Sequence, residues 1–172
     1  MTAKIIDGRL IAEKIKNQVK QDVAALKQKG VQVGLAVILV GNDPASHVYV
    51  SSKIRACEQA DISSFENHLP ETATEADVRN IIKSLNENPN VHGILLQLPL
   101  PAHLLEVQED LVQTIAPEKD VDGLTVTNAG KLFLAHGDGH IPCTPQGCMH
   151  LIRSVEPNLR GKVATVIGRS NL

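Results

Sequence analysis

Apolar residues recur at every third or fourth position across residues 7–29, and a glycine follows at position 30. This spacing places an apolar stripe along one side of a helix, and Gly30 marks the end of that helix. The stripe consists of Ile11, Ile15, Val19, Val23 and Leu26. We expect this amphipathic helix to lie against a β-sheet.

Residues 33–40 read VGLAVILV, an apolar run without polar alternation. A strand of this kind is covered on both faces, which is typical of a parallel sheet. Helix and strand patterns then alternate along the chain. They occupy residues 43–60 (helix), 62–69 (strand), 74–85 (helix), 92–98 (strand) and 104–115 (helix). The alternation predicts an α/β fold with a right-handed parallel sheet between two helical layers, three layers in all.

Polar side chains lie in three loops: residues 41–49 and 97–101 follow predicted strands, and residues 120–123 follow the helix after the second of these. In parallel α/β sheets, ligands bind beyond the carboxyl ends of the strands. The sequence therefore predicts that these loops converge on one cleft.

The pattern changes after this domain. Residues 128–144 contain clustered Gly and Pro without a sustained period, which indicates a hinge. Thr144 and Pro145 are a favourable N-cap and first helical residue, so a helix is predicted to start there. We assign residues 1–138 to a first, catalytic domain.

Residues 162–167 are predicted to form a strand that enters a glycine turn, as at the start of a nucleotide-binding unit. Such a βαβ unit needs about 30 residues, whereas only twelve remain from Gly161 onward. We therefore expect residues 139–172 to be the hinge, helix and first strand of an incomplete Rossmann-type domain.

The net charge of −2 and the isoelectric point near 6.4 show no electrostatic footprint for nucleic acid or an anionic membrane. The first 16 residues mix charged residues with short apolar pieces, so no signal peptide is predicted, and no stretch is long enough to span a membrane. These features favour a cytoplasmic location. They also favour small molecules or further copies of the chain as partners.

The cysteines are Cys57, Cys143 and Cys148, an odd number without CxxC spacing. This pattern argues against a disulfide framework and against a zinc site. We interpret them as reduced thiols that mostly pack in the core, and we predict no metal site.

A candidate catalytic helix begins at Asp43, a favourable N-cap, followed by Pro44. Ser46, Tyr49 and Lys53 share one face of this helix with apolar residues. A lysine on such a face is costly unless it is paired or used, and desolvation can produce an amine that exchanges protons near neutral pH. The alternative is a lysine that extends past the edge of the core, with Tyr49 as packing.

Gln97 is unusual because it lies inside the apolar stretch ILLQLPLP. A buried amide needs hydrogen-bond partners, which a ligand, Lys53 or the loop backbone could supply. Asp122 is the next candidate, either as a ligand-binding carboxylate or as a turn former before Gly123. The residues themselves leave these alternatives open.

The spacing YxxxK at Tyr49 and Lys53 also occurs in short-chain dehydrogenases, but no glycine-rich nucleotide turn precedes Tyr49, so that interpretation is rejected. Other motifs extend along the chain. They are DPAS (43–46), GILLQLPLP (93–101), PEKDVDG (117–123), PCTP (142–145) and GRSN (168–171). In order and spacing they resemble the bifunctional methylenetetrahydrofolate dehydrogenase/methenyltetrahydrofolate cyclohydrolase family.

The resemblance implies a role for each candidate residue. Lys53 would be the general acid/base of the cyclohydrolase step, and Gln97 would hold and tune it. Tyr49 would stack on the folate, and Asp122 would bind the pterin end. The implied catalytic residues are thus Lys53, Tyr49, Gln97 and Asp122, and the implied substrate-binding residues are Ser46, Tyr49, Gln97, Leu98 and Asp122.

Gly168, Arg169 and Ser170 match the cofactor turn of the family, and an arginine there suits the 2′-phosphate of NADP. The implied reaction is oxidation of 5,10-methylenetetrahydrofolate to 5,10-methenyltetrahydrofolate, followed by hydrolysis to 10-formyltetrahydrofolate. Tetrahydrofolate derivatives are the implied substrates, and a homodimer is the implied assembly.

Members of the family continue through the rest of the nucleotide domain and a final helix that returns to the first domain. The resemblance therefore implies a C-terminally truncated chain that lacks dehydrogenase activity of its own. Two alternatives are the substrate domain of an amino-acid or shikimate-type dehydrogenase and a non-catalytic folate-binding or dimer-forming remnant. Comparing turnover of methylenetetrahydrofolate with turnover of a 2-amino acid distinguishes the family from the first alternative. Folate binding without turnover identifies the second alternative.

Overall fold

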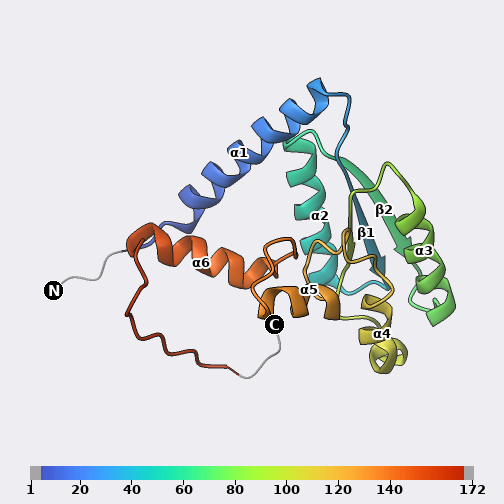
Figure 1. Ribbon diagram of the computed structural model, residues 1–172. Helices are drawn as coiled ribbons and strands as arrows, with labels where there is room; N and C mark the ends of the chain where they lie inside the picture. The colour runs from blue at the N-terminus through green and yellow to red at the C-terminus, as the bar shows by residue number, and fades with distance from the viewer. Residues whose placement is uncertain (1–4, 169–172) are drawn as a thin grey trace.

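The computed structural model describes residues 5–168 and is built around a parallel sheet (Figure 1). Its strands are β1 (Gly34–Val40), β2 (Ser63–Leu69) and β3 (Gly93–Leu96), in the order β2-β1-β3. The predicted strands and their parallel arrangement are confirmed. β3 ends earlier than expected because Pro99 has no N–H with which to continue the ladder.

Helices cover both faces of the sheet. On one face lies α2 (Pro44–Gln59), and on the other lie α3 (Glu75–Glu87) and α4 (Gln108–Val112). Alternate residues of β1 enter the two cores: Ile38 packs on the α3 side, and Leu39 packs on the α2 side. This arrangement is the predicted three-layer α/β architecture.

The cap predicted for α2 is present, and α3 is capped as well. Asp43 accepts a hydrogen bond from the Ser46 N–H at 2.7 Å, and Pro44 occupies the first turn. In α3, Thr74 and Asp77 form a capping box. The start of each helix is therefore determined by local residues.

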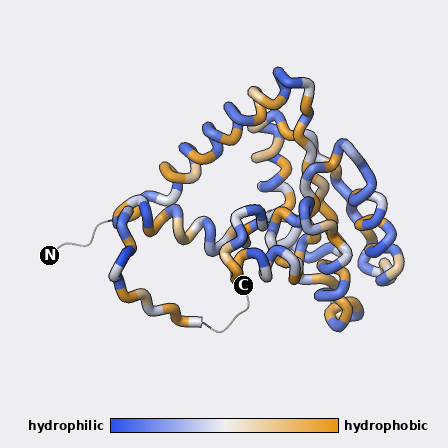
Figure 2. Tube along the Cα trace, in the orientation of Figure 1, coloured by the Kyte–Doolittle hydropathy of each residue, from blue (hydrophilic) through white to orange (hydrophobic). Residues whose placement is uncertain are grey.

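The first helix, α1 (Gly8–Gln28), forms with Asp7 as its N-cap, and Gly30 follows it with φ +84°. Its expected packing against the sheet is wrong, because Val23 is its only buried residue in the described part of the chain. The helix projects away from the sheet, and its N-terminal half lies beside α6 (Cys143–Val155) (Figure 1). Figure 2 shows that apolar positions still alternate with polar ones along it.

The helix predicted at residues 104–115 is divided into a 3₁₀ segment, η1 (Ala102–Val107), and the short α4. Between them the Gln108 side chain accepts a hydrogen bond from the Leu100 N–H at 3.0 Å, which folds this segment back onto the preceding loop.

The predicted hinge also contains a helix, α5 (Val126–Phe133). It was missed because eight residues are too few to show a helical period and because Gly130 lies within them. Its signal is Thr125, an N-cap whose hydroxyl accepts a hydrogen bond from the Asn128 N–H at 3.4 Å. The next helix, α6, starts at Cys143, slightly before the predicted Thr144–Pro145 pair.

The strand predicted at residues 162–167 is absent. Its apolar side chains are exposed, with Val163 at 95% and Ile167 at 98%, and it pairs with no strand of the described chain. An extended segment without a neighbouring strand has no ladder to complete. No helix in the described residues is both long and apolar enough to cross a membrane.

Candidate functional site

Lys53 is positioned by the direction of α2. The helix starts just after β1 and runs back along the face of the sheet (Figure 1). This direction brings Lys53 within hydrogen-bond distance of Gln97, the residue that follows β3. Its first turn is anchored by Asp43, whose pKa is lowered mainly by the hydrogen bond from the Ser46 N–H. Lys53 is half-buried on this face.

The ammonium group of Lys53 donates a hydrogen bond to Gln97 Oε1 over 2.9 Å. The other end of the same amide, Nε2, donates to the Leu98 carbonyl over 2.7 Å, and the Gln97 backbone N–H bonds to Ile38 O. Two of the three partners considered for the Gln97 amide, Lys53 and the loop backbone, therefore bind it at the same time. Its orientation is set by the backbone bond, which leaves Oε1 to face the lysine.

Asp122 is half-buried and lines the same cavity as Lys53. Burial raises the pKa of Asp122, and the charge of Asp120 adds to this effect. The positive charge of Lys53 and the Cys143 thiol act in the opposite direction. The Asp122 carboxyl is thus partly shielded from solvent and lies in the field of the Lys53 charge.

The cavity that contains Lys53 and Asp122 has a volume of about 1040 Å³. It lies between α2, the beginnings of β1 and β3, the loop after residue 120, and the first turn of α6. Its walls are mainly apolar, with a few polar groups. Besides Lys53 and Asp122, these include His92 and Cys143. Such a lining suits a ligand with a flat organic body and a small number of hydrogen-bonding groups.

Leu98 faces a neighbouring cavity of about 710 Å³, formed by α4, α5 and the loop between them. Leu124 and Pro142 line both cavities, so the two adjoin. Tyr49 lines neither of them and is 62% exposed, whereas Ser46 is buried in the first turn of α2. The predicted residues therefore gather only in part, with Lys53, Gln97 and Asp122 as the central group.

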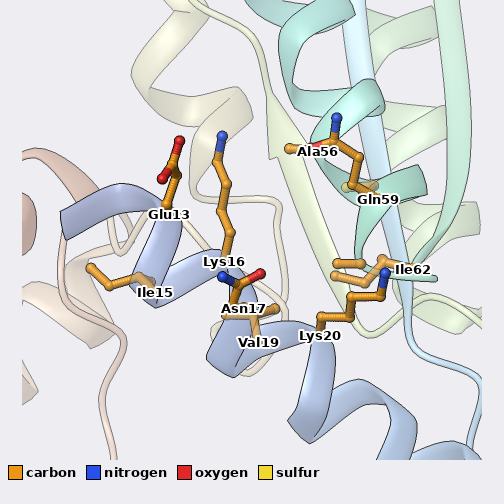
Figure 3. A pocket seen from close by; sticks show the side chains of 11 residues that line it. Glu13, Ile15, Lys16, Asn17, Val19, Lys20, Ala56, Gln59 and Ile62 are labelled. Atoms are coloured by element: carbon orange, nitrogen blue, oxygen red, sulfur yellow. The ribbon is translucent and has the colours of Figure 1, made fainter. Parts of the chain in front are cut away.

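A further cavity of about 560 Å³ lies between α1 and the end of α2. Figure 3 shows Glu13 and Lys16 extending from α1, with Ala56 and Gln59 of α2 on the opposite side. It contains none of the predicted site residues, and we assign it no chemistry.

The cysteine interpretation is partly wrong. All three thiols are free, but only Cys57 is buried, while Cys143 and Cys148 are exposed. The Cys143 Sγ donates to the Val121 carbonyl over 3.6 Å, at the edge of the large cavity. Burial of the sulfur, together with the nearby Asp122 charge, raises the pKa of Cys143, so this thiol is protonated near neutral pH.

A family model described as "Tetrahydrofolate dehydrogenase/cyclohydrolase, catalytic domain" matches residues 6–122. The chain belongs to this family. It is 46% identical over 172 residues to the bifunctional protein FolD of Polaromonas naphthalenivorans and 49% identical over 172 residues to that of Caulobacter vibrioides. These matches cover 100% and 99% of this chain but 60% and 57% of the relatives. The chain thus spans about 60% of the length of these FolD proteins.

Solved structures of the family have the same fold. The bifunctional FolD enzyme of Campylobacter jejuni, a methylenetetrahydrofolate dehydrogenase/cyclohydrolase, superposes with a TM-score of 0.94 at 44% identity, covering 98% of this chain and 59% of that one. The Trypanosoma brucei enzyme, solved with NADP cofactor and an inhibitor, gives 0.83 at 34% identity, with 90% and 52% covered. The family resemblance found in the sequence motifs is therefore confirmed.

The predicted cofactor turn is the part of the candidate site that the structure describes least. Arg169 and Ser170 lie outside the described residues. Gly168 belongs to an exposed segment in which nothing lies within 4 Å of the position that a Cβ would take. Residues 5–168 therefore form no cradle that fits a dinucleotide.

Sequence reasoning assigned no role to two buried polar residues beside Asp122. They are Asp120 and Asn128, each 1% exposed. The signal for Asp120 is that it is the first of the two carboxylates in KDVDG, and the signal for Asn128 is its place within the first turn after Thr125.

Proposed function

We propose that this chain forms the folate site of a bifunctional FolD-type enzyme and that its own residues carry out the cyclohydrolase step. That step converts 5,10-methenyltetrahydrofolate to 10-formyltetrahydrofolate. The proposal rests on one observation above all: Lys53, which lines the large cavity together with Asp122, is held by a 2.9 Å hydrogen bond to Gln97. Membership of the family supplies the substrate class.

The chemistry requires water to add to the methenyl carbon and a ring nitrogen to leave. The water loses both of its protons as it becomes the formyl oxygen: one is delivered to the ring nitrogen that leaves, and the other is released to solvent. A single group that accepts and donates a proton is sufficient for this. Lys53 takes this role as general acid/base. Gln97 Oε1 accepts a hydrogen bond from Lys53 Nζ, and this bond holds the Lys53 side chain in one orientation.

Asp122 serves the pterin end of the substrate. A carboxylate accepts hydrogen bonds from adjacent N–H groups, and such charge-assisted bonds are stronger than neutral ones. Tyr49, exposed on the same helix as Lys53, is available to stack on the aromatic part of the folate. Leu98 completes the proposed substrate contacts in the adjoining cavity, whereas Ser46 is buried in the first turn of α2 and is not proposed to touch the substrate.

The dehydrogenase step is proposed for the whole protein. NADP would accept a hydride from the methylene carbon, and Gly168, Arg169 and Ser170 would begin the turn that holds it. Since residues 5–168 form no dinucleotide cradle, we expect this chain alone to bind NADP too weakly for turnover. We further propose a homodimer in the cytoplasm, by analogy with the family.

The test is to assay the purified chain, and the full-length polypeptide that carries this sequence, with 5,10-methenyltetrahydrofolate. Loss of the methenyl absorbance above the uncatalysed rate is expected for the full-length polypeptide. A reduced folate that binds without being hydrolysed would identify a non-catalytic binding module instead. The absence of both folate binding and hydrolysis would contradict the proposal.

Replacing Asp122 by asparagine should weaken folate binding by roughly 2 kcal/mol, because a charged acceptor becomes a neutral amide with a donor on one side. The ligand-free protein should not lose stability. The pKa of Asp122 is raised on folding, so its ionisation opposes folding increasingly as the pH rises from the ordinary carboxyl pKa through the raised value. Asparagine removes this effect, and the variant should equal or exceed the wild type in melting temperature at neutral pH.

Asp138→Asn is the matched control. Its carboxylate is exposed, pairs with Lys131 at 3.0 Å, and has a lowered pKa, so the effect on stability has the opposite sign and folate affinity should not change. Titration calorimetry measures the folate affinity, and thermal melts measure the stability. Both are done between about pH 4, near the ordinary carboxyl pKa, and about pH 8. A collapse in melting temperature of Asp122→Asn with intact affinity would make residues 119–123 a structural turn only.

A further inference from the structure

Asp120 lies two residues before Asp122 in the same loop, and its carboxylate is buried. It is 1% exposed and accepts three hydrogen bonds, from the N–H groups of Leu124 (3.2 Å) and Thr125 (2.8 Å) and from Asn128 Nδ2 (2.9 Å). Burial opposes ionisation, but the hydrogen bonds prevail and keep the pKa of Asp120 below its ordinary value. A buried carboxylate with this set of donors is a fixed anion.

Asn128 extends the same network to a distant part of the chain. Its Nδ2 also donates to the Pro117 carbonyl over 2.8 Å, and its Oδ1 accepts from the His140 N–H over 3.2 Å. The side chain therefore joins the backbone just before KDVDG, the carboxylate within that motif, and the segment that leads into α6. One side chain thus fixes three parts of the chain relative to one another.

The other end of the loop is held by Lys119. Its ammonium group donates to the carbonyls of Leu85, Asn86 and Asn88 at the end of α3, over 3.1, 2.7 and 2.9 Å. The backbone between Lys119 and Asp120 is paired with β3 at Ile94. Asp122 thus lies in a loop whose two ends are both fixed.

The segment from residue 140 to α6 closes against the same loop. Gly123 has φ +66°, and a Cβ there would lie 2.8 Å from the His140 carbonyl oxygen and 2.9 Å from the Pro142 nitrogen. Only glycine allows so close an approach in this conformation. The bond from His140 to Asn128 therefore sets the position of α6, and of Cys143 on it, relative to Asp122.

We propose that Asp120 and Asn128 are positioning residues for the folate site: together they hold Asp122 toward Lys53 and set the first turn of α6 against it. This inference rests on the proposed function, because it requires Asp122 to contact the substrate. Asp120 itself is too buried to touch a ligand. It acts on the substrate only through the orientation and the electrostatic surroundings of Asp122.

Two variants separate the geometric from the electrostatic effect of Asp120 and Asn128 on Asp122. Both are made in the full-length polypeptide that carries this sequence. Asp120→Asn keeps the shape of the side chain and removes its charge and one acceptor. Asn128→Ala keeps the Asp120 charge and removes the links to Asp120, Pro117 and His140. Asp77→Asn on α3 is the control, since the same chemical change removes a helix cap far from the cavity.

We expect both Asp120→Asn and Asn128→Ala to raise the KM for 5,10-methenyltetrahydrofolate by about tenfold, because small displacements of a substrate-binding group weaken productive binding. Changes in kcat should be smaller, since Lys53 and Gln97 are untouched. The Kd for 5-formyltetrahydrofolate, a stable reduced folate, should rise in parallel. Asp77→Asn should lower the melting temperature and leave KM, kcat and Kd unchanged.

The pH profile supplies a readout that a purely structural role does not move. The groups that face Asp122 are Lys53 from α2, Cys143 from α6 and Asp120 from its own loop. Removing the Asp120 charge should lower the pKa of Asp122, so the loss of folate binding at acid pH should move to lower pH in Asp120→Asn. Asn128→Ala, which keeps that charge, should not show this downward shift.

Values of KM and Kd in Asp120→Asn and Asn128→Ala that match those of Asp77→Asn, with an unmoved acid limb, would overturn the positioning role. If Asp120→Asn fails to fold, Asn128→Ala still decides the geometric part through the KM against kcat comparison. The proposed function is judged separately by the wild type: no hydrolysis and no folate binding there would overturn both proposals, whereas wild-type activity with unaffected variants would overturn only this one.

Discussion

Lys53→Met should abolish hydrolysis of 5,10-methenyltetrahydrofolate while leaving folate affinity within about tenfold of the wild type. Methionine keeps the unbranched apolar stem that lies against the sheet and loses only the group that carries the proton. General acid/base catalysis contributes a factor of about a thousand, so the remaining rate should be close to the uncatalysed one. The measurements are the loss of methenyl absorbance and titration of 5-formyltetrahydrofolate.

Lys83→Met is the matched control for this variant. Lys83 is exposed on α3, on the face of the sheet opposite to α2, so the same substitution changes the charge equally and leaves the cavity intact. Hydrolysis at the wild-type rate in Lys53→Met would mean that Lys53 merely extends past the edge of the core. A loss of activity in Lys83→Met as well would point to net charge rather than to proton transfer.

The local parts of this site could be predicted from the sequence. Asp43 and Pro44 determine where α2 starts, and the apolar run of β1 determines that the helix packs on a buried strand. Those two facts are enough to put Lys53 beside the sheet. Its partner could be narrowed to a few groups, because an amide within an apolar strand has to be satisfied by something close to the strand end.

The parts that could not be predicted depend on contacts between distant segments. Nothing near Asp120 in the sequence shows that its carboxylate is buried under α5, since α5 itself is too short to be detected by period. The exposed position of Tyr49 is equally non-local, as a helical stripe shows which residues share a face but not how far the neighbouring layer extends over it.

The expectation that failed most clearly concerns α1. Its apolar stripe resembles that of a helix packed on a sheet, yet Val23 is its only buried residue in the described chain. Amphipathicity predicts that a helix has a face suited to burial and does not identify what covers that face. The same holds for Val163 and Ile167, whose β-type pattern has no neighbouring strand in residues 5–168.

Gly34→Ala should be the most destabilising single-methyl change in the sheet. Gly34 begins β1, and a Cβ there would lie 2.1 Å from the Asn90 carbonyl oxygen and 2.8 Å from the Phe65 ring. A carbonyl oxygen of the main chain cannot rotate away as a side chain can. The segment that carries this carbonyl is also fixed two residues further on, at His92. The Gly34 N–H donates to His92 Nδ1 over 3.1 Å, and the His92 N–H donates to the Gly34 carbonyl over 2.9 Å.

We therefore expect Gly34→Ala to lower the free energy of unfolding by about 3 kcal/mol through overpacking, which corresponds to about 10 °C in melting temperature for a chain of this length. Gly130→Ala is the control: this glycine lies within α5 with nothing within 4 Å of the position that an added methyl group would take, so alanine should stabilise the protein by up to about 1 kcal/mol. Urea and thermal unfolding measure both. A wild-type melting temperature for Gly34→Ala would show that the segment before β3 can move away from β1, and the cavity wall formed by Gly34 and His92 would then be adjustable rather than fixed.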